Sequence, residues 1–268
     1  MQRFSRNDRG GALCIPRYPF QPAHGTPVVD FIACSLFIPA MLLIVAGGEP
    51  PGRELLAGRA SRASRVIAAD RGARYCLDAG LRPDLVVGDM DSLTAETLAE
   101  LDRSGVACRV YSPHKDQTDT EIALGFALGD NPDRIEILGA LGRRFDHALA
   151  NVHLLYRSMQ GGVPAFIVAD TELVFLVTEE ATLVNATGLT VSFLPLTASV
   201  EGVVLEGFQY PLEDASMEIG RPVGVSNVVR HARARVRLAS GVLVGVMSAD
   251  MGSCRAEVVT ACRVGAMV

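Results

Sequence analysis

The sequence predicts two domains: an α/β N-terminal domain with a mostly parallel sheet, followed by an all-β sandwich domain. Between Met41 and Asp170, short β-rich runs alternate with segments of helical period, which is the rhythm of βα units. After about Glu172 the helical period disappears and strand-like runs remain. Of the 268 residues, 49% are hydrophobic and 21% are charged, which is sufficient for buried cores. We therefore divide the chain into an extension (1–40), an α/β domain (41–171), a β sandwich (172–248) and a tail (249–268).

The first half contains six candidate strands and three candidate helices. Apolar residues recur at spacings of three and four in the helical segments, whereas the strand candidates are short apolar runs rich in valine and isoleucine. The predicted strands are Leu42–Ala46, Val66–Asp70, Leu85–Asp89, Ala107–Tyr111, Ile135–Gly139 and Ala165–Asp170, and the predicted helices are Thr94–Arg103, Thr118–Leu128 and Phe145–Met159.

The second half reads as strands only. Alternation in the run Ala232–Leu238 predicts a half-buried strand with its arginines on the solvated face. The predicted strands lie around Leu183 and at Leu189–Leu194, Ser199–Leu205, Val223–Val229, Arg233–Leu238 and Val242–Met247.

The N-terminal region allows two interpretations. Phe31–Gly48 is uncharged over about the minimum length of a membrane span and follows several arginines, as a signal or anchor would. However, Pro39 interrupts this run, and Met41–Gly48 is typical of a buried strand that enters a glycine turn. We favour the strand, expect no membrane association, and regard Met41 as a candidate start of the protein.

Charge and cysteine content exclude some classes of protein. The net charge of −5 provides no broad positive field, so we expect no nucleic-acid partner. The cysteines show no CxxC pair or zinc-ligand spacing, and we interpret them as free thiols of a cytoplasmic protein. An even count also fits disulfides, which is the less favoured alternative. The six cysteines are Cys14, Cys34, Cys76, Cys108, Cys254 and Cys262.

Two aspartates follow the third predicted strand, in the run Gly88-Asp-Met-Asp-Ser. Asp89 and Asp91 can reach one ion, and Mg²⁺ prefers such hard oxygen ligands. An Asp-rich turn is also common as a helix cap or a solvated loop, so the motif alone is weak.

The run His114-Lys-Asp-Gln-Thr-Asp-Thr-Glu precedes an apolar helix. Thr118 or Asp119 can cap this helix, and Glu121 can complete a capping box. Capping does not account for Lys115 beside Asp116, whereas an ammonium next to carboxylates is what a metal-bound polyphosphate requires.

A third polar segment, Leu138-Gly-Ala-Leu-Gly-Arg-Arg-Phe-Asp-His, passes from a strand through a glycine turn into a helix. This arrangement places backbone N–H groups and Arg144 near an anion and predicts a phosphate-binding turn. Asp146 as a simple helix cap is the structural alternative. Because parallel strands end at one edge of a sheet, all three acidic segments are expected to meet there.

Together these segments resemble the thiamine pyrophosphokinase family. The resemblance rests on Asp70-Arg-Gly-Ala, Pro83-Asp-Leu-Val-Val-Gly-Asp-Met-Asp-Ser, Lys115-Asp-Gln-Thr-Asp-Thr-Glu-Ile-Ala-Leu and the run from Leu138 to Asn151, and it continues in Gly207-Phe-Gln-Tyr-Pro-Leu and Val225-Ser-Asn. It implies transfer of diphosphate from ATP to the hydroxyl of thiamine with release of AMP and use of Mg²⁺. It also implies a homodimer whose sites are shared between subunits.

The resemblance also implies roles for particular residues. The implied catalytic residues are Asp89, Asp91, Asp116 and Asp119, of which Asp89, Asp91 and Asp119 would bind metal; the nucleotide or phosphate group would contact Asp70, Lys115, Thr118, Arg144 and Asp146; and thiamine would contact Tyr210, Ser226 and Asn227.

Two positions depart from the family pattern, because Arg71 and Arg143 stand where glycine is common. An arginine there could add a phosphate contact or alter the turn if the glycine had positive φ. Two alternative functions stay open at this point: a pyrophosphokinase for another heterocyclic alcohol such as a pterin, and a non-catalytic thiamine- or nucleotide-binding regulator.

Overall fold

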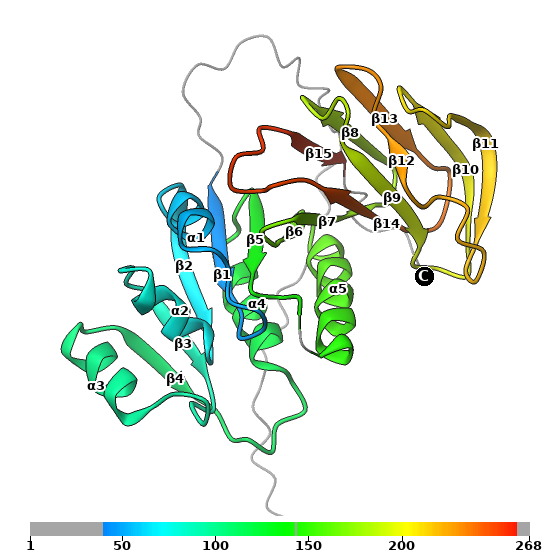
Figure 1. Cartoon of the computed structure of the whole chain (residues 1–268). Coiled ribbons are helices and arrows are strands. Elements are labelled where there is room, and N and C mark those ends of the chain that lie inside the picture. Colours follow the sequence, from blue (N-terminus) through cyan, green and yellow to red (C-terminus); the bar gives the residue numbers. More distant parts are fainter. Residues whose placement is uncertain (1–39, 143, 262–268) are drawn as a thin grey trace, which may run out of the picture. The chain divides into compact units, whose positions relative to one another are not determined.

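Six parallel strands form the first part of a large sheet in the computed structural model, which describes residues 40–142 and 144–261 (Figure 1). Their order across the sheet is β6-β5-β1-β2-β3-β4, so the chain reverses its direction of winding between the neighbours β1 and β5. All six predicted strands are confirmed. They are β1 (Met41–Val45), β2 (Ala63–Ala69), β3 (Leu85–Gly88), β4 (Ala107–Val110), β5 (Arg134–Leu138) and β6 (Ala165–Val168).

Helices cover both faces of these strands. Along β1, Leu43 and Val45 pack on the side of the first helices, whereas Leu42 and Ile44 pack on the side of the last two. The three predicted helices are confirmed; the other two have only about two turns each, too short for their period to be recognised in sequence. The helices are α1 (Arg53–Ala60), α2 (Gly72–Asp78) and α3 (Ala95–Arg103) on one face, and α4 (Asp119–Gly129) and α5 (Phe145–Gln160) on the other.

The same sheet continues into the second half. After β6 the chain turns back as β7, and the following strands pair antiparallel in the order β7-β14-β9-β12. A second sheet has the order β11-β10-β13-β8-β15. The added strands are β7 (Glu172–Val177), β8 (Glu180–Val184), β9 (Thr190–Pro195), β10 (Ser199–Glu206), β11 (Leu212–Glu218), β12 (Asn227–Val228), β13 (Arg233–Arg237), β14 (Leu243–Ser248) and β15 (Glu257–Ala261).

The sandwich prediction is confirmed, and β13 has the expected half-buried pattern with Ala234 and Val236 inside. Phe175 and Phe193 contact edge to face in the core, with ring centroids 6.4 Å apart. The predicted strand Val223–Val229 is largely wrong: residues 223–226 form a turn, which ends at Ser226 with φ of 58°. The segment 249–268, set apart as a tail, supplies β15 to the second sheet.

The described part of the N-terminal apolar run is the strand β1, and residues 31–39 lie outside the described residues. In the stretches 40–142 and 144–261, no helix is both long enough and apolar enough to cross a membrane. Cys76, Cys108 and Cys254 are free thiols, as predicted. Burial raises the pKa of the Cys76 thiol to about 12. The other three cysteines lie outside the described residues.

Candidate active site

A cavity of about 330 Å³ lies where the loops after β1 and β5 meet. It is lined by residues of both loops, by Asp70 after β2, and by the segment that leads into α4. In open α/β sheets, ligands bind at this position, because the loops on either side of the reversal diverge and leave a crevice. The three polar segments predicted from the sequence therefore meet at one edge.

Three carboxylates form the acidic centre of this edge. One oxygen each of Asp70, Asp89 and Asp91 lies within 4.8 Å of the others, close enough to hold a cation. Ser92 Oγ donates to Asp70 Oδ2 at 2.5 Å, while the buried Oδ1 of Asp70 has no hydrogen-bond partner among the described residues. An ionised buried oxygen without a donor requires a cation or water, so this group fits a divalent metal. The sequence placed Asp119 in the metal group, whereas the geometry brings Asp70 into it.

Unusual backbone conformations bring the carboxylates together. Asp70 and Met90 have positive φ values of 47° and 65°, and Gly88 has φ of 149°. A Cβ added at Gly88 would lie 3.1 Å from Asp70 Cβ and 3.3 Å from Asp119 Cγ. Gly88 thus permits the close approach of two acidic side chains from different segments, and larger residues there would separate them.

Lys115 lies between two of the segments. Its Nζ is 3.0 Å from Asp119 Oδ1 and 3.9 Å from Asp89 Oδ2. Burial raises the pKa of Asp119, an effect that Lys115 opposes and that the charges of Asp70 and Asp89 reinforce. Repulsion from Asp89 is the main cause that raises the pKa of Asp91. The four carboxylates therefore carry more negative charge than Lys115 alone can balance.

The entry to α4 has the predicted cap. Thr118 is the N-cap residue, and its Oγ1 accepts from Glu121 N at 3.1 Å. The Glu121 side chain contacts Gln117 and Arg157, so the return bond of a capping box is not formed. Thr118 also lines the cavity. Asp116 is exposed and does not line it, and its catalytic role stays a prediction.

Two glycine turns are fixed against each other at the cavity. Gly48 N donates to Gly139 O at 2.8 Å, and a Cβ at Gly48 would lie 2.5 Å from that oxygen. Gly142 has φ of 97°, which disfavours other residues. Asn151 on α5 donates to Ala140 O at 2.7 Å and thereby fixes the turn that follows β5. This closely packed backbone supports the predicted phosphate-binding turn.

The arginines near this turn differ in their contacts. Arg144 pairs with Asp146, with Nη2 and Oδ2 2.5 Å apart, and this bond lowers the pKa of Asp146. Both side chains are exposed, and the N-cap residue of α5 is Arg144 rather than Asp146. Arg71 lines the cavity with φ of −54°, so an arginine at this position causes no left-handed strain. Arg143 lies outside the described residues.

The residues assigned to thiamine do not line this cavity. Tyr210 is 61% exposed, while Asn227 is buried and bonds both the N–H and the carbonyl of Tyr210, at 3.0 and 2.8 Å. Ser226 is exposed, and its N–H donates to Ser192 Oγ. Asn227 therefore fixes the backbone that presents the Tyr210 ring.

Sequence reasoning assigned no role to four polar residues that line the cavity: Gln117, Thr120, His147 and Asn151. Each lies inside a segment already recognised, within five residues of an assigned one. The helical spacing of four between His147 and Asn151 indicates a shared face of α5, a signal that could have identified both.

A doubly wound sheet with a ligand-sized cavity and a group of three carboxylates at its reversal point, joined to a β sandwich, is typical of two-domain α/β enzymes. Residues 57–167 match the family model described as thiamin pyrophosphokinase, catalytic domain, and residues 177–243 match thiamin pyrophosphokinase, vitamin B1 binding domain. The chain belongs to the thiamine pyrophosphokinase family and is thus a transferase enzyme.

Individual relatives agree with this assignment. Thiamine pyrophosphokinase from Bacillus subtilis (strain 168) is 32% identical over 209 residues, which cover 77% of this chain and 98% of that protein. Thiamine pyrophosphokinase 1 from Oryza sativa subsp. japonica is 26% identical over 58% of this chain and 62% of its own length. The Bacillus subtilis crystal structure has a TM-score of 0.72 at 30% identity and covers 78% of this chain and 99% of its own. Yeast thiamin pyrophosphokinase, at 15% identity, shares the fold with a TM-score of 0.70, over 80% of this chain and 88% of its own.

Proposed function

We propose that this chain transfers the terminal diphosphate of ATP to the hydroxyl of thiamine and releases AMP, with Mg²⁺ bound in the carboxylate centre. The observation that carries the proposal is the group of Asp70, Asp89 and Asp91 within 4.8 Å, with Lys115 and the glycine turns beside it. Phosphoryl transfer requires two elements: carboxylates that bind a metal ion, and a cationic side chain that binds phosphate oxygens.

The metal-binding residues are taken to be Asp70, Asp89 and Asp91. The partnerless buried oxygen of Asp70 and the repulsion that raises the pKa of Asp91 both favour a bound cation. When bound, Mg²⁺ neutralises charge on the phosphate oxygens. Asp119 lies outside this metal group; it is half-buried and pairs with Lys115.

The protein's own residues align the two substrates. The ammonium of Lys115 lines the cavity and can contact phosphate oxygens, and the backbone around Gly142 provides a rigid surface for the diphosphate. Attack by the thiamine hydroxyl on the β-phosphorus breaks the bond to AMP, and the hydroxyl proton passes to a neighbouring carboxylate. Asp119 is suited to accept that proton, because its raised pKa makes it a better base than an ordinary aspartate.

Thiamine is cationic and aromatic, and the exposed ring of Tyr210 offers a suitable face for it. The match of residues 177–243 to the vitamin B1 binding domain favours thiamine over a pterin alcohol. A non-catalytic regulator is disfavoured, because the carboxylates of Asp70, Asp89 and Asp91 are all present and lie close together. We further propose a cytoplasmic location.

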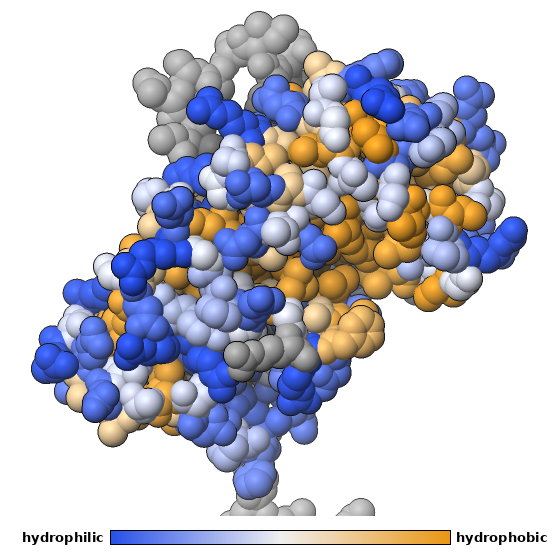
Figure 2. Space-filling view, viewed as in Figure 1, coloured by the Kyte–Doolittle hydropathy of each residue, from blue (hydrophilic) through white to orange (hydrophobic). Residues whose placement is uncertain are grey.

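We also propose a homodimer with shared sites, which the separation of the two sets of residues supports. None of Tyr210, Ser226 and Asn227 lines the 330 Å³ cavity beside Asp70 and Asp119, here called the carboxylate cavity, although both substrates must meet for transfer. Exposed apolar side chains lie near both sets: Phe145 and Leu149 on α5, and Val223 and Val225 beside Ser226. Figure 2 shows hydrophobic residues gathered over α5 and the neighbouring sandwich strands. Such a surface is expected to be covered by a second copy.

The reaction can be tested directly. Purified protein is incubated with ATP, Mg²⁺ and either thiamine or a pterin alcohol, and AMP and the diphosphorylated acceptor are quantified by liquid chromatography. We expect AMP and thiamine diphosphate in equal amounts, no turnover with chelator, and little product from the pterin. ADP in place of AMP, or equal use of both acceptors, would contradict the proposal.

A further inference from the structure

A second cavity lies away from the carboxylate centre, at the opposite end of β5. Its volume is about 730 Å³, within the range of small-molecule sites. It lies between the end of α1, the start of β5 and the loop that precedes β15. No residue assigned above to ATP, metal or thiamine lines it.

Positively charged residues predominate in this cavity. Its lining includes four arginines and two glutamates, an excess of two positive charges in a chain whose net charge is −5. The charged lining residues are Arg59, Arg62, Arg134, Arg255, Glu136 and Glu257. A cavity with a local excess of positive charge raises the concentration of small anions near it.

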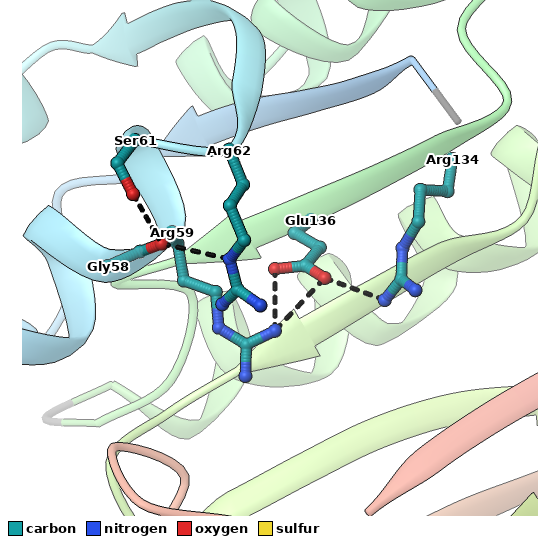
Figure 3. A network of polar contacts seen from close by, with 6 residues as sticks. All are labelled: Gly58, Arg59, Ser61, Arg62, Arg134 and Glu136. Carbon is teal, nitrogen blue, oxygen red and sulfur yellow. Dashed lines mark hydrogen bonds and ion pairs between the residues drawn. The ribbon is translucent and has the colours of Figure 1, made fainter. Parts of the chain in front are cut away.

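A buried carboxylate holds two of these arginines in place. Glu136 is 3% exposed and lies 3.1 Å from Arg59 Nη1 and 2.6 Å from Arg134 Nη2. Figure 3 shows their guanidinium groups on either side of the carboxylate, with Arg62 reaching down beside Arg59. Arg134 also lies over the ring of Phe166, 4.5 Å from its centroid, and its buried Nε has no hydrogen-bond partner among the described residues. These contacts preorganise the cationic groups before any ligand binds.

The other two arginines, Arg62 and Arg255, are exposed. Within residues 40–142 and 144–261, neither Arg62 nor Arg255 is paired with a carboxylate. Arg62 is held by a bond from its Nε to Gly58 O at 3.0 Å, which leaves its terminal nitrogens available. Planar guanidinium groups bind phosphate with two parallel hydrogen bonds, a geometry that lysine cannot provide.

We propose that this cavity, named here the arginine cavity, binds a small phosphorylated metabolite through its phosphate or diphosphate group. Arg62 and Arg255 contact the anion, and Arg59 and Arg134, fixed by Glu136, set the positive potential. The volume favours a small molecule over a phosphorylated peptide segment. The site is separate from the proposed reaction and does not depend on it.

Binding of inorganic pyrophosphate is measured by isothermal titration calorimetry in the presence of chelator, so that no metal bridges the probe to the carboxylate centre. The test variant is the double substitution Arg62→Gln/Arg255→Gln. Both side chains are exposed, so little packing is lost. The matched control, Arg103→Gln/Arg221→Gln, removes the same charge from other exposed positions. A second comparison, Lys115→Met, weakens phosphate contacts at the carboxylate centre.

We expect the test variant to bind pyrophosphate about tenfold or more weakly, because charged hydrogen bonds are lost, while the matched control binds as the wild type does. Equal affinity in the test variant and the wild type would overturn the proposal. An equal loss in the control variant would reduce the effect to net charge, and a loss confined to Lys115→Met would place the anion at the carboxylate centre. If the double variant does not fold, Arg255→Gln alone serves in its place, with Arg221→Gln as control.

Discussion

Lys115 Nζ lies 3.0 Å from Asp119 Oδ1, one helical turn along the chain, and 3.9 Å from Asp89 Oδ2 on another segment. One ammonium thus links the entry of α4 to the end of β3. Both side chains of the close pair are largely buried, with 16% of Lys115 and 24% of Asp119 exposed. The charge state of this pair follows from the balance between burial, which disfavours ionised Asp119, and the lysine, which favours it.

Replacing Lys115 with methionine should raise the pKa of Asp119 further. Burial already raises this pKa, and the lysine opposes that effect; without it, the repulsion from Asp70 and Asp89 is also unopposed. Carbon-13 NMR titration of labelled aspartate carboxyls in the metal-free protein measures the change. Lys115→Arg keeps the positive charge, so Asp119 in this variant should titrate close to its wild-type behaviour. An unchanged Asp119 titration in Lys115→Met would contradict the role given to this contact.

Asp91→Asn should weaken magnesium binding without harming the fold. The folded-state pKa of Asp91 is raised, so its ionised form costs stability above that pKa, and the cost is relieved as the pH falls through it. The metal-free variant should therefore melt no lower than the wild type at neutral pH. Adding Mg²⁺ should raise the Tm of the wild type and raise that of the variant less, because only the folded state binds the ion.

Thermal melts with and without Mg²⁺, together with AMP release, check both parts. Asp78→Asn is a matched control, since this aspartate is exposed on α2 and, among the described residues, its carboxylate pairs only with Arg74. Equal Tm shifts in Asp91→Asn and the wild type would remove Asp91 from the metal site.

The sequence alone predicted the strand-end positions of the acidic residues, because parallel strands bring their carboxyl ends to one edge. It did not predict that Asp70 would join Asp89 and Asp91, since this depends on left-handed backbone at Asp70 and Met90, a conformation that no local pattern indicates. Asn227 was assigned to thiamine, yet its side chain bonds the Tyr210 backbone. A buried amide and a ligand-binding amide look alike in sequence, because burial depends on distant strands.

Glu136→Ala should destabilise the protein by about 3 kcal/mol, because it leaves Arg59 and Arg134 without their shared carboxylate in a largely buried position. Urea unfolding followed by circular dichroism measures the loss. Glu257→Ala is the control, since this exposed glutamate lines the same cavity without an ion pair among the described residues. A loss below about 1 kcal/mol, the size of a surface pair, would show that Glu136 does not hold the arginines.

Tyr210→Ala should raise the KM for thiamine about tenfold, through loss of ring contact and cation–π attraction, and leave the KM for ATP unchanged. The Tm should stay near that of the wild type because the ring is 61% exposed. Tyr210→Phe keeps the ring and should retain most affinity. Asn227→Ala, in contrast, removes buried hydrogen bonds to the Tyr210 backbone and should lower both Tm and thiamine affinity. If Tyr210→Ala raised the KM for ATP as much as the KM for thiamine, the ring would not be a specific contact of thiamine.

Two defective variants should restore activity when their subunits mix. Asp89→Ala removes a carboxylate of the metal group, and Tyr210→Ala removes the proposed thiamine contact, which does not line the carboxylate cavity. If each site combines the carboxylate centre of one subunit with the Tyr210 surface of the other, a mixed dimer has one intact site and one doubly defective site. At a one-to-one ratio half of the dimers are mixed, so about a quarter of the sites should be intact.

The mixture is assayed at low thiamine concentration, where Tyr210→Ala alone turns over slowly. Subunit exchange is followed independently with differently tagged chains, by native mass spectrometry. A mixture of Asp89→Ala with Asp91→Ala serves as control, because both changes fall in the same half of the site and no intact site can form. Exchange of subunits without recovery of activity would place each complete site within a single chain. The separation between Tyr210 and the carboxylates would then have to be closed by a movement of the sandwich rather than by a partner.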